Sequence, residues 1–164
     1  RTVSGDACEL DEVLTSFDAM LGKPVKFDTV FIDAPCSGTG TMRRHPEIPW
    51  RLTENDVTTE LPKLQLMMLK EAAARVAAGG ELIYATCSVF DEENTQVVDA
   101  FLASPEGACF TVAPLSEAQI LQLPDFEQAK KLVFVRQNDR GLFQSVPVNA
   151  DSYDGHFCAR LIRK

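Results

Sequence analysis

The chain has 164 residues, 45% of them hydrophobic, a size that suits one domain with a buried core and leaves little room for two. Its formal net charge of −8 argues against broad adhesion to nucleic acid, because such binding depends on lysine and arginine. Without a run of about 20 apolar residues for a membrane span, and without the apolar segment of a secretory signal, we expect a soluble, cytoplasmic protein.

The first half of the chain alternates predicted strands and helices. Residues 3–5 are expected to end a strand, and Asp6 to cap a helix whose apolar residues recur at helical spacing as far as Gly22. Residues 27–33 predict a strand, and their continuous apolar character is typical of a parallel strand covered on both faces. A loop-like stretch, residues 38–55, follows.

The next elements continue the alternation. An apolar stripe predicts a long helix from residue 61 to Gly79, and residues 81–86 predict the next buried strand. Asp91 is expected to cap a further helix. The inward face of that helix would be Val97, Val98, Phe101 and Leu102. Strand, helix, strand and helix in this order predict an α/β fold with a parallel sheet and right-handed crossovers.

The last third of the chain has a different pattern. Residues 110–112, 132–136 and 157–162 predict strands, with turn signals at residues 138–141 and 154–155 between them. The sheet is therefore expected to end in an antiparallel hairpin. Residues 113–129 fit a helix or a loop equally well.

Two cysteines stand at the ends of predicted neighbouring strands. Cys36 follows Asp33-Ala34-Pro35, and Cys87 follows the strand that ends at Thr86. Open α/β sheets carry their chemistry at the carboxyl ends of strands. We therefore predict a site that contains Asp33, Cys36 and Cys87.

The other three cysteines, Cys8, Cys109 and Cys158, have apolar neighbours and are expected to be packing residues. Five cysteines is an odd number and none forms a Cys-x-x-Cys pair, so neither a disulfide framework nor a metal site is predicted.

A thiolate beside an acid suits one kind of pyrimidine chemistry. The thiolate adds to the double bond between carbons 5 and 6 of the ring, which makes carbon 5 nucleophilic. The reaction also needs an acid at the ring, a methyl donor and an eliminating step. Asp33, Cys36 and Cys87 supply the acid and two thiols.

An ordered set of motifs resembles the catalytic domain of the Sun/Fmu-type RNA cytosine-5 methyltransferases. Within that family the Arg-Arg-His-Pro segment with Trp50 is most similar to the bacterial ribosomal RNA small subunit methyltransferase B branch. The motifs are residues 33–40, Arg43-Arg44-His45-Pro46 with Trp50, Gln65 and Leu69, Gly79-Gly80, Thr86-Cys87-Ser88, Glu93-Asn94 and residues 154–161.

The resemblance implies a fold and a set of roles. The fold would be the C-terminal half of a Rossmann-like class I methyltransferase sheet, mostly parallel with a terminal antiparallel hairpin. Cys87 would be the nucleophile, Cys36 would help to release the product, and Asp33 would contact both the cytosine and the methyl donor. Asp6 would bind the adenine end of S-adenosylmethionine, although by itself it fits a helix cap equally well. The partner would be RNA, with ribosomal RNA favoured.

The chain departs from the family pattern before Asp6. The family binds its methyl donor mainly through a glycine-rich loop, and no such loop occurs before residue 38. We therefore expect residues 1–164 to be a partial methyltransferase domain that lacks the first two strands, with little affinity for S-adenosylmethionine and no turnover by itself. A sheet edge exposed in this way predicts that the opening strand pairs with residues 27–33, or that two chains associate there.

Other functions remain open from the residues alone. Arg43 and Arg44 fit either solvated surface charge or phosphate contacts. A non-catalytic RNA-binding or scaffold domain could keep the fold, although it would have no use for two thiols at strand ends. A redox protein could use Cys36 and Cys87 as an exchangeable pair, although such pairs more often lie within one short motif.

Overall fold

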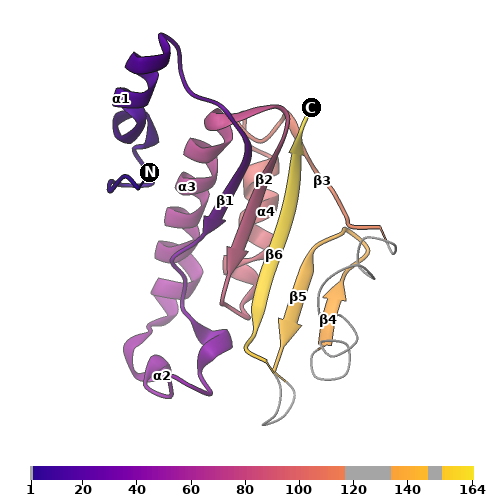
Figure 1. Cartoon of the computed structure of the whole chain (residues 1–164). Helices are drawn as coiled ribbons and strands as arrows, with labels where there is room; N and C mark the ends of the chain where they lie inside the picture. Colours follow the sequence, from indigo (N-terminus) through magenta and orange to yellow (C-terminus); the bar gives the residue numbers. More distant parts are fainter. Residues whose placement is uncertain (1, 117–133, 148–152) are drawn as a thin grey trace.

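The computed structural model describes residues 2–116, 134–147 and 153–164 (Figure 1). Its six-stranded sheet has the order β1-β2-β6-β5-β4, with β3 also paired to β6. β1 and β2 are parallel, whereas β6 runs antiparallel to β2, β3 and β5. The strands are β1 (Phe27–Asp33), β2 (Val76–Thr86), β3 (Phe110–Val112), β4 (Phe134–Gln137), β5 (Phe143–Val146) and β6 (His156–Arg163). The predicted α/β class and terminal antiparallel hairpin are confirmed.

Helices lie between and beside the strands. They are α1 (Leu10–Leu21), η1 (Thr39–Thr41), α2 (Ile48–Arg51), the π-helical η2 (Asp56–Glu60), α3 (Leu61–Arg75), η3 (Asp91–Glu93) and α4 (Thr95–Leu102). In the view of Figure 1, α3 and α4 lie behind the sheet and α1 lies beside α3. Within the described residues, no helix has both the length and the apolar character that crossing a membrane requires.

The hydrophobic core lies between the sheet and α3 and α4. Alternate β2 residues, Leu82 and Tyr84, point into it and are fully buried, as period-2 geometry requires. Tyr84 packs edge-on against Phe157 of β6, with ring centroids 6.2 Å apart. Phe101 of α4 packs against Phe110 of β3 at 5.5 Å. β6 thus shares one core with β2.

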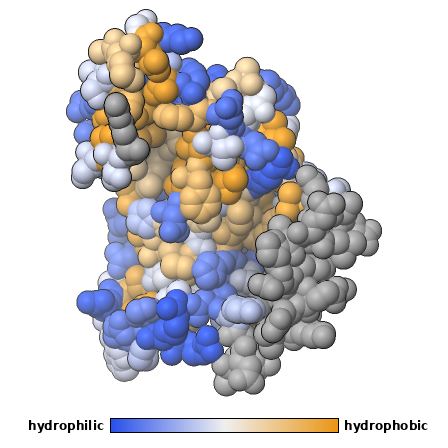
Figure 2. Space-filling model, in the orientation of Figure 1, coloured by the Kyte–Doolittle hydropathy of each residue, from blue (hydrophilic) through white to orange (hydrophobic). Residues whose placement is uncertain are grey.

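The opposite face of β1 is open, so the prediction that this strand is covered on both faces is wrong. Ile32 points toward the helices and is buried, whereas its neighbour Phe31 is 61% exposed. Figure 2 shows hydrophobic side chains gathered over the middle of this face, with mostly hydrophilic ones below them. β1 therefore has one buried apolar face and one exposed apolar face. A continuous apolar sequence does not distinguish this arrangement from a strand that is buried on both faces.

The predicted strand at residues 3–5 is also wrong. Residues 2–5 have no strand partner, and β1 pairs with β2 alone among the described strands. The opening segment therefore does not shift to cover the free edge of β1, because a strand forms only where a neighbour satisfies its backbone groups.

Several helix boundaries differ from the prediction. The predicted helix that ended at Gly79 ends at Arg75, and the chain enters β2 at Val76 because Val76 pairs with Phe27 ahead of a register shift. Gly79 has a φ of +75° within that irregular stretch, a conformation that glycine adopts readily.

The expected caps are wrong as well. The N-cap of α1 is Glu9 instead of Asp6, and the N-cap of α4 is Asn94 instead of Asp91, because a short turn precedes each helix. Asp6 stabilises such a turn, since its Oδ1 accepts a hydrogen bond from the Cys8 amide at 2.8 Å.

The structure contains helices and a strand that the sequence did not predict. The predicted loop at residues 38–55 contains η1 and α2, and β5 was not predicted at all. Of the undecided segment 113–129, residues 113–116 form no helix or strand, and the rest lies outside the described residues. The predicted strand at 132–136 corresponds to β4 from residue 134 onward.

Candidate active site

The structure brings Cys36 and Cys87 together, with their sulfur atoms 3.3 Å apart. β1 and β2 end side by side, since Asp33 pairs with Ala85. The Ala34 amide adds one more bond to the Ala85 carbonyl at 2.9 Å, after which Pro35 has no N–H to continue the ladder. The chain leaves the sheet there, so each strand delivers its cysteine to the same point.

A three-way backbone junction holds the two cysteine loops. The Gly40 amide donates to the Cys87 carbonyl at 2.8 Å, and the Gly155 amide donates to the Gly40 carbonyl at 2.9 Å. A Cβ at Gly40 would lie 2.0 Å from the Gly155 oxygen and 2.8 Å from the Cys87 oxygen. Glycine is therefore required at position 40 by backbone approach.

Hydroxyl groups next to the cysteines form a buried cluster. The Ser37 hydroxyl lies 3.1 Å from both the Thr39 and the Ser88 hydroxyls, and the last two are 3.3 Å apart. The Glu93 carboxylate, which is fully buried, accepts from the Ser37 amide at 2.8 Å and from the Ser88 hydroxyl at 2.6 Å. The cluster connects the loop after β1 to the loop after β2.

Burial and a neighbouring thiol both act on Cys36. Burial raises the pKa of Cys36 to about 12, and its hydrogen bond with Cys87 adds to the shift. Cys36 therefore holds its proton at neutral pH. Both cysteines remain partly exposed, so a ligand can reach them.

Asp33 and Asp6 lie on another side of the site. Asp33 is exposed at the end of β1 and lines a hollow of about 250 Å³ with Ala7, Leu10 and Phe31. Asp6 is also exposed and directly precedes Ala7. The structure thus brings the N-terminal turn and the end of β1 to one hollow, but no hydrogen bond among the described residues joins either carboxylate to Cys36 or Cys87.

Arginines follow the Cys36 loop and are held by an acid from the C-terminal part. The Arg44 guanidinium donates to Asp154 through Nε at 2.8 Å and also through Nη2, and Arg43 lies 3.7 Å from the same carboxylate. The hydrogen bonds from Arg44 lower the pKa of Asp154. Arg44 therefore has a structural partner in addition to any phosphate contact.

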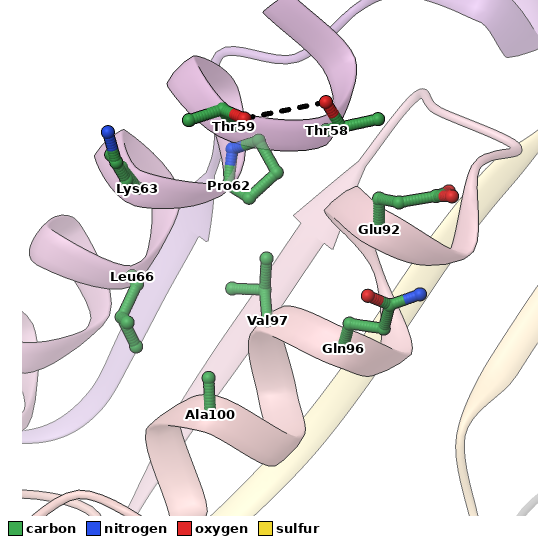
Figure 3. Close-up of a pocket in the computed structure, with 9 residues that line it drawn as sticks. All are labelled: Thr58, Thr59, Pro62, Lys63, Leu66, Glu92, Gln96, Val97 and Ala100. Carbon is green, nitrogen blue, oxygen red and sulfur yellow. Dashed lines mark hydrogen bonds between the residues drawn. The ribbon is translucent and has the colours of Figure 1, made fainter. Parts of the chain in front are cut away.

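Two further hollows lie beyond the cysteine loops. One, of about 330 Å³, is lined by Thr39 and Phe90 of those loops and by residues of α2 and η2. The other, of about 280 Å³, lies between the start of α3 and α4 (Figure 3). Figure 3 shows Leu66 and Val97 on its walls, and Thr58 and Thr59 joined by a hydrogen bond at its rim.

The sequence motifs include Gln65, Ser88 and Glu93 but indicate no role for them. Glu93 is hydrogen-bonded to Gln65, 28 residues away in the sequence, and to Ser37, 56 residues away. The nearest local signal was the acidic run at residues 91–93, which by itself indicates a solvated surface. Their role therefore becomes visible only in three dimensions.

Comparison with known proteins adds to this geometry. The family model described as 16S rRNA methyltransferase RsmB/F matches residues 2–162. The ribosomal RNA small subunit methyltransferase B of Salmonella arizonae is 39% identical over 140 residues, which cover 85% of this chain and 27% of the relative. The protein of the same name from Escherichia coli O6:K15:H31 is 36% identical, with the same two coverages. The chain thus spans about a quarter of the length of these relatives.

Solved structures share the fold. The crystal structure of PH0851 superposes with a TM-score of 0.64 at 33% identity, and the match covers 87% of this chain and 28% of that one. The structure of NSun6 from Pyrococcus horikoshii with SFG superposes with a TM-score of 0.69 at 20% identity, over 99% of this chain and 34% of that one. The fold is therefore that of Rossmann-like methyltransferases. With the family model matching nearly the whole chain, the chain belongs to the RsmB/F family of 16S rRNA methyltransferases.

Proposed function

We propose that this chain carries the chemical site of an S-adenosylmethionine-dependent methyltransferase that acts on carbon 5 of cytosine in RNA, with ribosomal RNA as the substrate and the cytoplasm as the compartment. The observation that carries the proposal is the 3.3 Å separation of the Cys36 and Cys87 sulfurs at the ends of adjacent parallel strands. In a family of rRNA methyltransferases, two thiols so placed suit a reaction in which one bonds to the base and the other assists release.

In this proposal Cys87 is the nucleophile. Its thiolate attacks carbon 6 of the cytosine, a carbon–sulfur bond forms, and the electron pair of the double bond moves to carbon 5. Cys36 keeps its proton at neutral pH, so it can donate a hydrogen bond to the Cys87 sulfur across the 3.3 Å between them.

Release completes the reaction. After methylation, a base such as water takes the proton from carbon 5, the electron pair of that bond restores the ring double bond, and the carbon–sulfur bond breaks and returns Cys87 as a thiolate. We assign assistance with this step to Cys36, because its sulfur is in direct contact with the sulfur that must depart.

The hollow beside Asp33 fits a methyl donor. Its lining combines apolar side chains with one exposed carboxylate, a donor set that suits a molecule with both an apolar ring and hydrogen-bonding polar groups. When bound, S-adenosylmethionine would supply an electrophilic methyl group from its sulfonium centre. We propose that Asp33 contacts the donor and the cytosine, and that Asp6 binds the adenine end.

These contacts are few, so we expect the 164 residues by themselves to bind the donor weakly. Isothermal titration calorimetry on this chain would contradict that expectation if it found micromolar affinity.

Trapping tests the chemistry. RNA that contains 5-fluorocytosine has no proton to lose from carbon 5, so the full-length protein should form a covalent complex with it that survives denaturation. We expect Cys87→Ala to abolish the complex and Cys36→Ala to accumulate an undissociated adduct with unmodified RNA. Cys109→Ala is the matched control, since its sulfur bonds to the Glu106 carbonyl at 3.7 Å and, among the described residues, to neither Cys36 nor Cys87.

The same experiment separates the other functions. A scaffold domain would bind RNA without forming any covalent complex, and a redox protein would show no dependence on the fluorinated base. An adduct that persists in Cys87→Ala would assign the nucleophile elsewhere.

We also propose that two chains associate through the free edge of β1. Two observations support this. β1 has no second neighbour among the described strands, and its Phe31 side chain is 61% exposed. Exposed strand edges of this kind pair readily. Sedimentation equilibrium of the 164-residue chain should show a dimer that Phe31→Lys weakens. A monomer at tens of micromolar would reject the idea.

A further inference from the structure

We propose that Glu93 is a positioning residue that sets the separation of the two cysteine sulfurs by holding the residue that follows each cysteine. Its Oε2 accepts from the backbone amide of Ser37, directly after Cys36, at 2.8 Å. Its Oε1 accepts from the hydroxyl of Ser88, directly after Cys87, at 2.6 Å. The catalytic meaning of this arrangement rests on the proposed function, whereas the arrangement itself does not.

The position of Glu93 is itself fixed from several sides. The side chain is fully buried, and its own carbonyl accepts a hydrogen bond from the Tyr84 hydroxyl at 2.6 Å. The next residue, Asn94, bonds to the Thr86 hydroxyl at 2.6 Å and to the Ser88 carbonyl at 2.9 Å. The end of β2 therefore holds Glu93 on one side, while Glu93 holds the loop after β1 on the other.

Gln65 of α3 completes the arrangement. Its Nε2 donates to Glu93 Oε2 at 3.0 Å and to the carbonyl of Pro35, the residue before Cys36, also at 3.0 Å. Its Oε1 is buried without a described partner. Cys36 is thus flanked on both sides by groups that converge on one carboxylate oxygen.

The hydrogen-bond directions explain why a carboxylate is needed. Ser88 Oγ already accepts from the Ser37 hydroxyl and from the Phe90 amide, each at 3.1 Å. Its own proton must therefore go to Glu93 Oε1. Both oxygens of Glu93 face donors, and a carboxylate is the side-chain group of this shape that only accepts.

An amide in place of the carboxylate cannot satisfy both ends. In Glu93→Gln the oxygen would stay with the fixed Ser37 N–H, and the NH₂ group would face a Ser88 oxygen that already accepts two hydrogen bonds. The substitution thus leaves side-chain volume nearly unchanged and releases the Cys87 loop. Glu92→Gln, on the partly exposed neighbour, is the matched control.

The first readout needs no substrate. Diamide, an azo oxidant, takes two electrons and two protons from a pair of thiols, which become a disulfide while the azo group becomes a hydrazine. Peptide mapping of the full-length protein measures how fast Cys36 and Cys87 become linked. We expect Glu93→Gln to slow this rate about tenfold or more, since small misplacements of reacting atoms have effects of this size, and Glu92→Gln to leave it within about twofold.

The second readout uses RNA. Glu93→Gln should lower kcat for methyl transfer about tenfold with the KM for RNA within about twofold, because the lost contact orients the thiols and does not bind substrate. It should also accumulate RNA adduct, as we expect of Cys36→Ala. If the thiol effect appears but no protein, wild type included, modifies RNA, the proposed function fails and the positioning role stands.

A folding control keeps the test decisive. Circular dichroism and urea unfolding establish that the variant is folded under assay conditions. If Glu93→Gln does not fold, Ser88→Ala, which keeps Glu93 but removes the donor to Oε1 together with the acceptor of the Ser37 hydroxyl and the Phe90 amide, carries the same expectation for disulfide formation. A folded variant that links its cysteines and turns over at the wild-type rate would overturn the proposal.

Discussion

Gly40→Ala tests whether backbone approach holds the cysteine loops in place. An added Cβ would lie 2.0 Å from the Gly155 carbonyl oxygen, 2.6 Å from the Gly155 carbonyl carbon and 2.8 Å from the Cys87 carbonyl oxygen. All three atoms belong to backbone, so no side chain can rotate away. Overpacking typically destabilises by about 1–3 kcal/mol, and we expect this variant to reach about 3 kcal/mol or more.

Gly22→Ala is the matched control. Gly22 ends α1 with a φ of +66°, and nothing lies within 4 Å of a Cβ built there. Its substitution therefore carries only the left-handed backbone penalty of about 1 kcal/mol. Replacing glycine by alanine lowers the conformational entropy of the unfolded chain equally in both variants. The difference between their losses of unfolding free energy, about 2 kcal/mol or roughly thirtyfold in the unfolding equilibrium, therefore isolates the steric effect at position 40.

Urea unfolding with an unchanged slope measures both free energies. Gly40→Ala should also slow linkage of Cys36 and Cys87 by diamide, because the clash displaces the Cys87 carbonyl. If Gly40→Ala loses no more stability than Gly22→Ala, the three-way junction does not constrain the site and the reasoning fails.

Three further predictions follow from the fold and the charges. Phe101→Ala, at a fully buried ring, should lower the free energy of urea unfolding by about 3–5 kcal/mol, whereas Phe31→Ala, at a ring that is 61% exposed, should lower it by about 1 kcal/mol or less; equal losses would contradict the assignment of the core. The pKa of Asp154 is lowered by its hydrogen bonds from Arg44. The ionised carboxylate therefore adds to the free energy of unfolding above the unfolded pKa of about 3.9, and this stabilisation is lost as the pH falls below that value. Asp154→Asn should therefore flatten the acid limb of stability measured against pH, and an unchanged limb would refute the pairing. Because the pKa of Cys36 is about 12, iodoacetamide at pH 8 should label Cys36 much more slowly in the folded protein than in the unfolded protein. Mass spectrometry measures both rates, and equal rates would show that burial does not protect the thiol.

The sequence was informative where structure depends on near neighbours. The bounds of β1 were predicted as observed, because an apolar run ends at an acid, a proline and small residues. The meeting of Cys36 and Cys87 followed from one rule, that adjacent parallel strands present their carboxyl ends at one edge. Neither inference needed knowledge of distant contacts.

The errors arose where distant partners decide the outcome. Residues 3–5 were predicted to end a strand but have no described neighbour to pair with, and Val76 leaves its helix because Phe27 offers a strand partner. The role of Glu93 depends on groups from three separate segments. A run of acidic residues at a turn carries no local sign that one of them is buried.

The place of β6 has a consequence for how the sheet closes. This strand follows the other described strands in the chain, yet it lies between β2 and β5, and the turn before it supplies both Gly155 and Asp154 to the loop after Cys36. The described sheet is therefore continuous only once β6 has inserted between two strands that precede it in the chain. Until residues 154 and 155 reach the loop after Cys36, that loop lacks two of its backbone and side-chain partners.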